Sequence, residues 1–477
     1  MSLHFGRSTT FIKQSRLTQF SQPLLITTLL LSAAFAVSAG ATVLLDPRPE
    51  PGTTQFGRAM AVVGDLDHDG VPDLAVGAPF QDGDFLGTPG FGKPQNPGKI
   101  WVLSGKTLSV LFTMDDPKYQ QEGANPQFGG QVGYSVSALA DINGDGVPDV
   151  VAGVPHNVPG DFNAGSGIIN AGEALVFSGA DGSVLRTLDD PTQQEGGLLG
   201  YAVAGLGDVN GDGVPDMAVG VPGKNIGDES DGLIAVGEVY VFSGADGSMI
   251  RTLDHPTQEV NARFGSALDN AGDIDHDGVS DILIGAPGHG EAFVFSGATG
   301  ALIFKVTSPV TETQPSFGTA VAGGKDLDND GTPDFAIGAP FQKSARGGVF
   351  VYKGSDGTLL RTLRIPSPQT FARFGAAIQL SNDFTGDGRP DIIVGVPDRD
   401  VNGVINAGEV LIFNGATGRV FKTLTSALPQ TGAGFGSAVT AADFDGDGTP
   451  TAVVGTPYEN ANLLGVTHLQ IGQIEIQ

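Results

Sequence analysis

The sequence predicts an all-β protein that folds as a seven-bladed β-propeller with four antiparallel strands per blade. Three observations lead to this fold. An Asp-rich motif of nine residues occurs seven times, every copy is followed by the same order of apolar runs and turn residues, and the first strand of the mature chain matches the strand that the last repeat lacks. Outside the N-terminal segment, no run of residues has the 3.6-residue apolar period of a long helix.

The first element of the chain is a predicted signal peptide at residues 1–41. It begins with the basic residues Arg7, Lys13 and Arg16, has no acidic residue before Asp46, and continues with an apolar run at residues 24–37. Small residues follow, and this order is typical of a secretory signal that is cleaved after residue 39 or 41. The apolar run is shorter than the roughly 20 residues of a membrane span; an uncleaved anchor is the alternative. We therefore expect a secreted protein, extracellular or at the cell surface, with the periplasm as an alternative.

Each of the seven repeats in residues 42–477 carries signals for strands, which we call A to D. Strand A opens with an apolar residue and Gly, as in Phe264-Gly265, and the nine-residue motif follows. Strand B is a short apolar run closed by Gly-x-Pro, as at residues 282–287. Strands C and D, for example residues 238–242 and 249–253, flank a Gly-rich turn, which completes an antiparallel meander. Strands B and C are apolar on both faces, which indicates sheets stacked around an axis; an open linear array is the alternative.

The ends of the chain favour a closed ring. The last repeat has strands A, B and C, with C at residues 473–477, and it has no strand D. Residues 42–47 resemble the D strands that end at Pro191 and Pro256. The first strand of the mature chain is therefore expected to complete the last blade, which leaves no unpaired sheet edge in the ring.

The nine-residue motif, D-x-[DNT]-x-D-G-x-[PS]-[DT], has the chemistry of a calcium loop. Side-chain oxygens stand at positions 1, 3, 5 and 9, position 7 offers a backbone carbonyl, and Gly at position 6 allows a sharp turn. Ca²⁺ takes roughly six to eight oxygen ligands, whereas Mg²⁺ keeps more of its waters. The motif is not an EF-hand, because the residue at position 12 is apolar in strand B. The alternative is a set of plain Asp-Gly hairpin turns.

The calcium loops are predicted at residues 65–73, 141–149, 208–216, 273–281, 326–334, 383–391 and 443–451. Five loops have complete ligand sets, namely Asp65, Asp67, Asp69, Asp73; Asp141, Asn143, Asp145, Asp149; Asp208, Asn210, Asp212, Asp216; Asp273, Asp275, Asp277, Asp281; and Asp326, Asp328, Asp330, Asp334. Two loops are weaker, because Asp383, Thr385, Asp387, Asp391 include a threonine and Asp443, Asp445, Asp447 lack an aspartate at position 9.

Charge and cysteine content agree with bound calcium. The formal net charge is −28, from 53 acidic and 25 basic residues, and the loops hold nearly half of the acidic residues. Such an acidic excess argues against nucleic acid and anionic membranes as partners. There is no Cys, so neither disulfides nor thiolate ligands contribute, and bound metal is the expected source of extra stability.

The order of Phe-Gly, calcium loop and Gly-Ala-Pro resembles the FG-GAP repeat family. The sequence is similar to the N-terminal β-propeller of integrin α chains, and more similar still to bacterial FG-GAP proteins. The resemblance implies that the A–B loops bind calcium and that the protein has an adhesion or ligand-binding role. It departs from the integrin pattern in having a calcium loop in every blade and no leg domains, so integrin-type heterodimers and signalling are not expected.

A ligand is expected at the end of the propeller opposite the calcium loops. The B–C loops at that end are long, at residues 80–98, 156–171, 223–236 and 458–471, and variable loops on a rigid scaffold commonly bind ligands. The candidate ligand-binding aromatic residues are Phe80, Phe85, Phe91, Phe162 and Tyr458. The expected partner is an extracellular protein or glycan.

The sequence argues against an enzyme. Its seven His form no HExxH motif or close cluster, and no nucleophile elbow, P-loop or separate pair of carboxylates occurs. The predicted function is therefore a secreted calcium-binding module for binding or cell adhesion. The alternatives are a polysaccharide-active enzyme on a propeller scaffold and a structural envelope or matrix protein.

Overall fold

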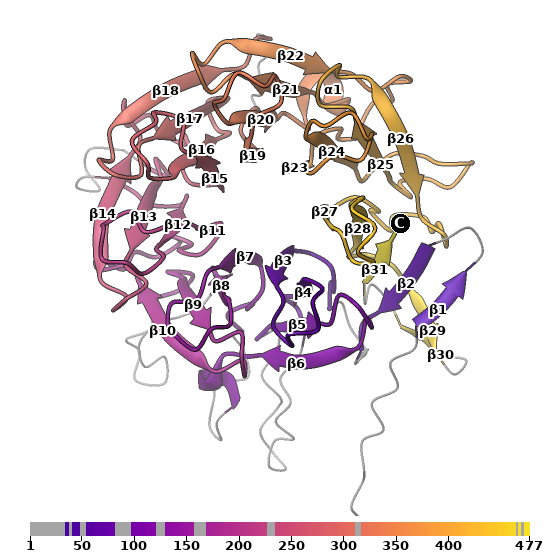
Figure 1. Cartoon of the computed structure of the whole chain (residues 1–477), viewed down its shortest axis with the longest axis horizontal. Coiled ribbons are helices and arrows are strands. Elements are labelled where there is room, and N and C mark those ends of the chain that lie inside the picture. Colours follow the sequence, from indigo (N-terminus) through magenta and orange to yellow (C-terminus); the bar gives the residue numbers. More distant parts are fainter. Residues whose placement is uncertain are drawn as a thin grey trace, which may run out of the picture. The chain divides into compact units, whose positions relative to one another are not determined.

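The computed structural model describes residues 34–37, 41–47, 54–81, 97–120, 129–156, 168–226, 234–310, 316–463, 466–468 and 472–477. All strands described here belong to one compact unit, Ser32–Gln477. Within this unit, seven antiparallel sheets stand around a central axis as the blades of a propeller (Figure 1). The predicted fold class is confirmed. Among the described residues, no helix is long and apolar enough to cross a membrane.

The blades follow one another along the chain. Blade 1 contains β3 (Met60–Gly64), β4 (Asp73–Ala78), β5 (Lys99–Leu103) and β6 (Val110–Met114); blade 2 contains β7 (Ser135–Leu139), β8 (Asp149–Val154), β9 (Glu173–Phe177) and β10 (Val184–Asp189); blade 3 contains β11 (Val203–Gly205), β12 (Met217–Val221), β13 (Glu238–Phe242) and β14 (Met249–Asp254); blade 4 contains β15 (Ala267–Gly272), β16 (Asp281–Ala286), β17 (Glu291–Phe295) and β18 (Leu302–Thr307).

The remaining blades have the same arrangement. Blade 5 contains β19 (Ala320–Lys325), β20 (Asp334–Gly338), β21 (Val349–Tyr352) and β22 (Leu359–Leu363); blade 6 contains β23 (Ala377–Ser381), β24 (Asp391–Val396), β25 (Glu409–Phe413) and β26 (Val420–Thr425); blade 7 contains β27 (Ala438–Ala442), β28 (Thr451–Thr456), β31 (Gln473–Ile476) and β2 (Ala41–Leu45). Short additional elements are β1 (Ala34–Val37), η1 (Pro117–Gln120), α1 (Gln342–Ala345) and the hairpin β29 (Ala461–Leu463) with β30 (Val466–His468).

The N-terminal strand closes the ring, as the sequence predicts. Strand β2 pairs antiparallel with β31, with Thr42 opposite Ile476 and Leu45 opposite Gln473, and Figure 1 shows these two ends of the chain side by side. The additional strand β1 extends the same sheet by pairing with β2. Strand β1 lies within the predicted signal peptide, most of which lies outside the described residues, so the signal peptide stays a prediction.

The first strand of every blade lines the axis, and the fourth strand lies at the outer rim (Figure 1). Neighbouring inner strands contact each other all the way round, and the contact between β27 and β3 completes the circle. Strands B and C are buried along their length in most blades; in β4 and β5, for example, every residue is buried. Burial on both faces explains why these strands do not alternate between apolar and polar residues.

A contact between two glycines joins each blade to the next. A Cβ atom added to Gly77, in strand B of blade 1, would lie 2.1 Å from the carbonyl oxygen of Gly133 in blade 2. The same contact recurs at every border, with distances of 1.7–2.3 Å, and ends with Gly455 against Gly57. No larger side chain fits at such a close approach. The glycines of Phe-Gly and Gly-x-Pro are therefore needed for stacking of the blades.

Candidate metal centres

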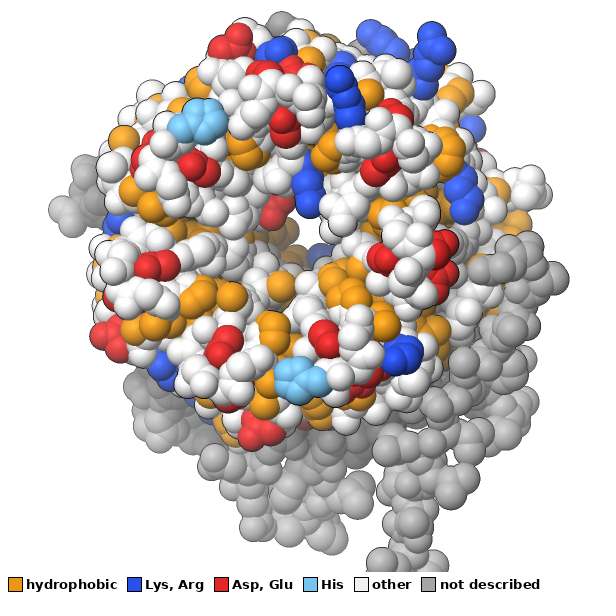
Figure 2. Space-filling model, viewed as in Figure 1, with side chains coloured by type: hydrophobic (Ala, Val, Ile, Leu, Met, Phe, Trp, Pro, Cys, Tyr) orange, Lys and Arg blue, Asp and Glu red, His pale blue; other side chains and the backbone are white. Residues whose placement is uncertain are grey.

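The Asp-rich motifs form the A–B loops, on one end of the propeller. Acidic side chains recur around the face shown in Figure 2, and the ring is open at its centre. Position 6 of all seven loops has a positive φ, between 82° and 92°. Side chains rarely adopt this conformation, which explains why Gly occupies position 6 in every copy.

The aspartate at position 1 shapes each loop. In all seven loops its Oδ2 atom accepts a hydrogen bond from the backbone N–H of the position 6 glycine, at 2.5–3.0 Å. The N–H groups of Gly213 and Gly448 lower the pKa of Asp208 and Asp443. These carboxylates are therefore anionic over a wide pH range, as a cation ligand must be.

Positions 3 and 5 continue the same pattern. The position 3 oxygen accepts the N–H of position 5 in six loops, at 2.8–3.2 Å. The position 5 carboxylate accepts the N–H of position 7 in all seven loops, at 2.7–3.0 Å. Backbone hydrogen bonds thus bend the loop around its own carboxylates before any ion is bound.

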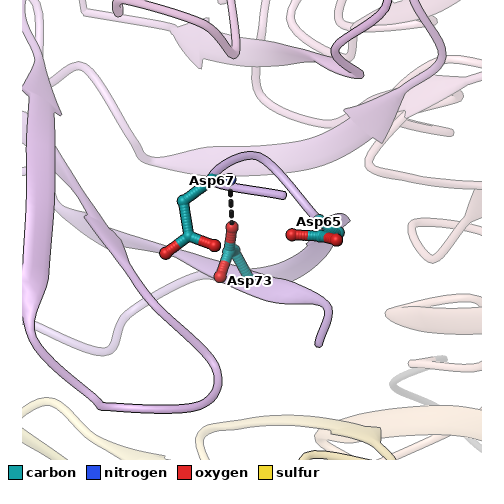
Figure 3. Close-up of side chains that lie close together, drawn as sticks. All are labelled: Asp65, Asp67 and Asp73. Atoms are coloured by element: carbon teal, nitrogen blue, oxygen red, sulfur yellow. Dashed lines mark hydrogen bonds between the residues drawn. The ribbon is translucent and has the colours of Figure 1, made fainter. Parts of the chain in front are cut away.

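Three carboxylates converge in four of the loops. One oxygen from each of Asp65, Asp67 and Asp73 lies within 4.8 Å of the other two, and Figure 3 shows the three side chains around a common space. The same holds for Asp273, Asp275, Asp281; for Asp326, Asp328, Asp334; and for Asp443, Asp445, Asp447. Carboxylates this close repel one another unless a cation lies between them. A set of hard oxygen donors in a tight loop fits Ca²⁺.

The other three loops have an amide or hydroxyl at position 3, from Asn143, Asn210 or Thr385. Their carboxylates at positions 1, 5 and 9 do not form such a triplet among the described residues. Conversely, the seventh loop, which the sequence places among the weaker ones, brings together as many carboxylates as the first. All such acidic triplets found in the described part of the chain lie in the A–B loops.

The aspartate at position 9 has a structural role that the sequence did not reveal. In blades 1 to 6 it is fully buried. Its Oδ2 atom accepts the N–H of position 2 at 2.7–2.9 Å. Its Oδ1 atom accepts the N–H of a glycine in the C–D turn at 2.8–3.1 Å. One carboxylate thus links the A–B loop to the C–D turn of its blade.

This linkage explains why the seventh motif departs from the others. Strand D of blade 7 comes from the N-terminal part of the chain, so blade 7 has no C–D turn. Position 9 is Thr451 in this blade, and it is half-buried rather than fully buried. A carboxylate there would have no turn glycine to bind.

The end opposite the metal loops carries exposed apolar side chains. The B–C and D–A loops hold Ile169, Ile234, Val260, Phe341, Phe371, Ile405 and Leu428, whose exposed fractions run from 39% to 69%, and we call these residues the apolar loop surface. Backbone hydrogen bonds join the two kinds of loop: Phe371 donates to Ser344, and Asn261 donates to Ile234. The B–C and D–A loops therefore form one continuous end of the propeller.

The structure places only part of the predicted ligand surface. Phe80 and Tyr458 lie at this end and are half-buried, not exposed as expected. Phe85, Phe91 and Phe162 lie outside the described residues. Sequence reasoning missed Phe371 and Ile405, because each lies in a short segment between strands that has no apolar periodicity to mark it.

An aromatic and cationic cluster lies at the start of strand A in the first three blades. The Arg58 guanidinium stands over the Tyr134 ring, 4.9 Å from its centroid, and the rings of Tyr134 and Tyr201 are 5.2 Å apart. The equivalent residues in the other blades are small: Ser266, Thr319, Ala376 and Ser437. One side of the axis at this end is therefore chemically distinct from the other.

Comparison with known proteins gives matches along the propeller. The FG-GAP repeat matches residues 56–103, 132–169, 199–242, 264–302 and 317–352, and an FG-GAP-like repeat matches residues 383–454. Together these segments make up more than half of the chain.

Similar curated proteins cover the chain in part. Integrin alpha-5 of Xenopus laevis is 35% identical over 43% of this chain and 20% of the relative. Integrin alpha-PS5 of Drosophila melanogaster is 36% identical over 40% of this chain and 19% of the relative. Integrin alpha pat-2 of Caenorhabditis briggsae is 30% identical over 57% of this chain and 22% of the relative. The chain thus spans about a fifth of the length of these relatives.

Proposed function

Because the chain belongs to the FG-GAP repeat proteins and forms an integrin-α-like β-propeller, we propose that it is an extracellular, calcium-binding module for ligand binding or cell adhesion. The proposal also includes that the chain is secreted, that it is an FG-GAP protein of the bacterial secreted type, and that it has no catalytic role. The ligand is an extracellular protein, and a glycan is the competing outcome of the test below.

The apolar loop surface is the observation that carries the proposal. Phe371 is 69% exposed, and Ile234 and Ile405 are each 58% exposed, all on loops at one end of the ring. Large apolar side chains that are exposed on the loops at one end of a rigid scaffold favour an interaction site at that end. They favour a protein ligand, because hydrophobic and aromatic anchors supply much of the affinity at protein interfaces.

The A–B loops would hold calcium through the side-chain oxygens at positions 1, 3 and 5, the position 9 carboxylate in blades 1 to 6, and the backbone carbonyl at position 7. When bound, the ion neutralises the clustered carboxylates. Leu66, at position 2 of the first loop, packs toward Gly179 in blade 2, so a loop that is held in shape also holds the neighbouring blade. Calcium therefore rigidifies the scaffold, and the ligand binds at the other end.

The test measures binding of the fluorescently labelled protein to cells of the source organism by flow cytometry. Phe371→Ser is expected to reduce binding by tenfold or more, on the scale of a lost interface anchor. Phe421→Ser is the matched control, because Phe421 is 52% exposed but lies in β26 at the outer rim. Equal binding by wild type and Phe371→Ser would contradict the proposal. Loss of binding after the cells are treated with glycosidase but not with protease would replace the protein ligand by a glycan.

A further inference from the structure

One position in the C–D turn faces the carboxylates of the A–B loop. It directly precedes the turn glycine and carries Ser104, Ser178, Ser243, Ser296, Lys353 and Asn414 in blades 1 to 6. In blade 3, Ser243 Oγ donates to Asp212 Oδ2 at 3.3 Å. In blade 6, Asn414 Nδ2 donates to Thr385 Oγ1 at 2.9 Å. A side chain at this position therefore reaches loop positions 3 and 5.

Blade 5 alone has a charged residue at this position. Lys353 Nζ forms an ion pair with Asp328 Oδ2, and it lies 3.9 Å from Asp330 Oδ2. Ser355, two residues later in the turn, donates to Asp330 Oδ2 at 2.7 Å. The side chains of Asp328 and Asp330 are only 13% and 29% exposed, so the ammonium group lies against two partly buried carboxylates that a metal ion in this loop would need.

A second cation comes from the neighbouring blade. Arg389, at position 7 of the sixth loop, lies with its Nη1 atom 3.4 Å from the Asp328 carbonyl oxygen. Among the described residues, no Lys or Arg side chain pairs with the carboxylates of the first and fourth loops, whose four aspartates stand at the same positions. Lys106 in blade 1 donates to the Asp69 carbonyl, not to a carboxylate.

We infer that Lys353 is a built-in counter-cation of the fifth loop, so that this loop keeps its shape without calcium and binds the ion more weakly than the first and fourth loops. The inference rests on the proposed calcium binding by the other loops. Ca²⁺ in this loop would need the Asp328 carboxylate, with which Lys353 already pairs, and the bound ion would be repelled by the nearby ammonium group. Asp326, Asp328 and Asp334 still bring three carboxylate oxygens within 4.8 Å of one another, so the site in this loop stays a prediction, with a lower expected affinity.

The test uses native mass spectrometry and calorimetric titration of the whole protein with calcium. Lys353→Ser restores the residue found in four other blades and is expected to tighten one site on the order of tenfold. The protein should then carry one more ion at calcium concentrations that leave the wild type partly filled. Ser296→Lys makes the converse change in blade 4 and should remove one ion. Lys422→Ser is the matched control, because Lys422 is exposed in β26 at the outer rim, and it should change neither affinity nor ion count.

The outcomes separate this inference from the proposed function. An unchanged or weaker calcium affinity in Lys353→Ser, with the other sites still filled, would overturn the inference and leave calcium binding intact. If the wild type binds no calcium at any loop, the proposed calcium binding fails. The counter-cation is then judged by melting in EGTA, where Lys353→Ser should melt at a lower temperature because the four aspartates lose their neutralising charge. An unchanged melting temperature in EGTA would overturn the inference.

Discussion

The Oδ1 atom of Asp281 accepts a hydrogen bond from the backbone N–H of Gly297 at 3.0 Å. Its other oxygen accepts the N–H of Ile274 at 2.7 Å, so a single buried carboxylate holds the A–B loop of blade 4 to the turn between strands C and D. Five other blades repeat this arrangement. Position 9 of the motif is therefore a support for the loop as well as a candidate ligand.

Asp281→Asn is expected to lower the free energy of unfolding by about 1–3 kcal/mol, the cost of leaving a buried polar group unsatisfied. The new amide has one oxygen to accept a hydrogen bond, and its NH₂ group faces a second backbone donor. Urea unfolding in EGTA measures the effect without any contribution from calcium. The control is Asp246→Asn, in the exposed part of another C–D turn, which should unfold like the wild type. Equal midpoints for the two variants would argue against the support role.

Calcium removal is expected to destabilise the whole propeller and not one blade. Each occupied site adds about 2.7 kcal/mol when free calcium is 100 times its dissociation constant. The A–B loops also pack on neighbouring blades, so removal of the ions is expected to weaken the contacts at several blade borders. Thermal melting in calcium, in magnesium and in EGTA should give a clearly higher midpoint in calcium alone. Identical midpoints in all three conditions would rule out calcium as a structural ligand.

Gly285→Ala tests the glycine contact between blades. The added Cβ would lie 2.1 Å from the carbonyl oxygen of Gly318, so blades 4 and 5 must move apart. Overpacking of this kind typically costs about 1–3 kcal/mol, and the unfolding midpoint in denaturant measures it. Gly207→Ala is the control, because the nearest heavy atom to its Cβ would be Ser280 Oγ at 3.9 Å. If Gly207→Ala were destabilised while Gly285→Ala unfolded like the wild type, the contact between Gly285 and Gly318 would not limit the packing of blades 4 and 5.

The sequence was sufficient for the features that repeat. The spacing of Gly265 from the fourth loop, and of Gly285 after it, recurs in the other copies, so the division into blades could be predicted. Ring closure could be predicted because residues 42–47 match the D strands of other repeats. Features that depend on contacts between distant residues could not. Asp281 and Gly297 are separated by a whole B–C hairpin, and nothing in the local sequence of Lys353 shows that it reaches Asp328.

The ligand surface formed by the B–C and D–A loops could be predicted only in part for the same reason. The predicted candidates were chosen by loop length and aromatic content, and Phe80 and Tyr458 are half-buried in the structure. Phe371 is the most exposed of the large apolar residues identified among the described part of the chain. Its backbone N–H donates to the Ser344 carbonyl oxygen of the B–C loop, a contact between segments that are distant in the sequence.

The buried Glu459 is expected to lower the free energy of unfolding of the protein as the pH rises. It is 1% exposed, at the start of the last B–C loop. Burial, together with the nearby charge of Glu475, raises its pKa from 4.5 to about 8. Between these values the folded protein keeps a proton that the unfolded chain releases, so stability falls as the pH rises through this window. This stabilisation is fully present when the pH is below the pKa of Glu459 in the unfolded chain, and it is lost once the pH exceeds the pKa of Glu459 in the folded protein.

Glu459→Gln cannot ionise, so its free energy of unfolding should decline less steeply between pH 5 and pH 8 than that of the wild type. The difference in slope is at most about 1.4 kcal/mol per pH unit for one proton. Denaturant unfolding at constant free calcium measures both slopes, so that changes in the metal loops cancel between the two proteins. Glu195→Gln is the control, because Glu195 is exposed and its replacement should leave the slope of the wild type. Parallel curves for wild type and Glu459→Gln would mean that Glu459 is ionised in the folded protein.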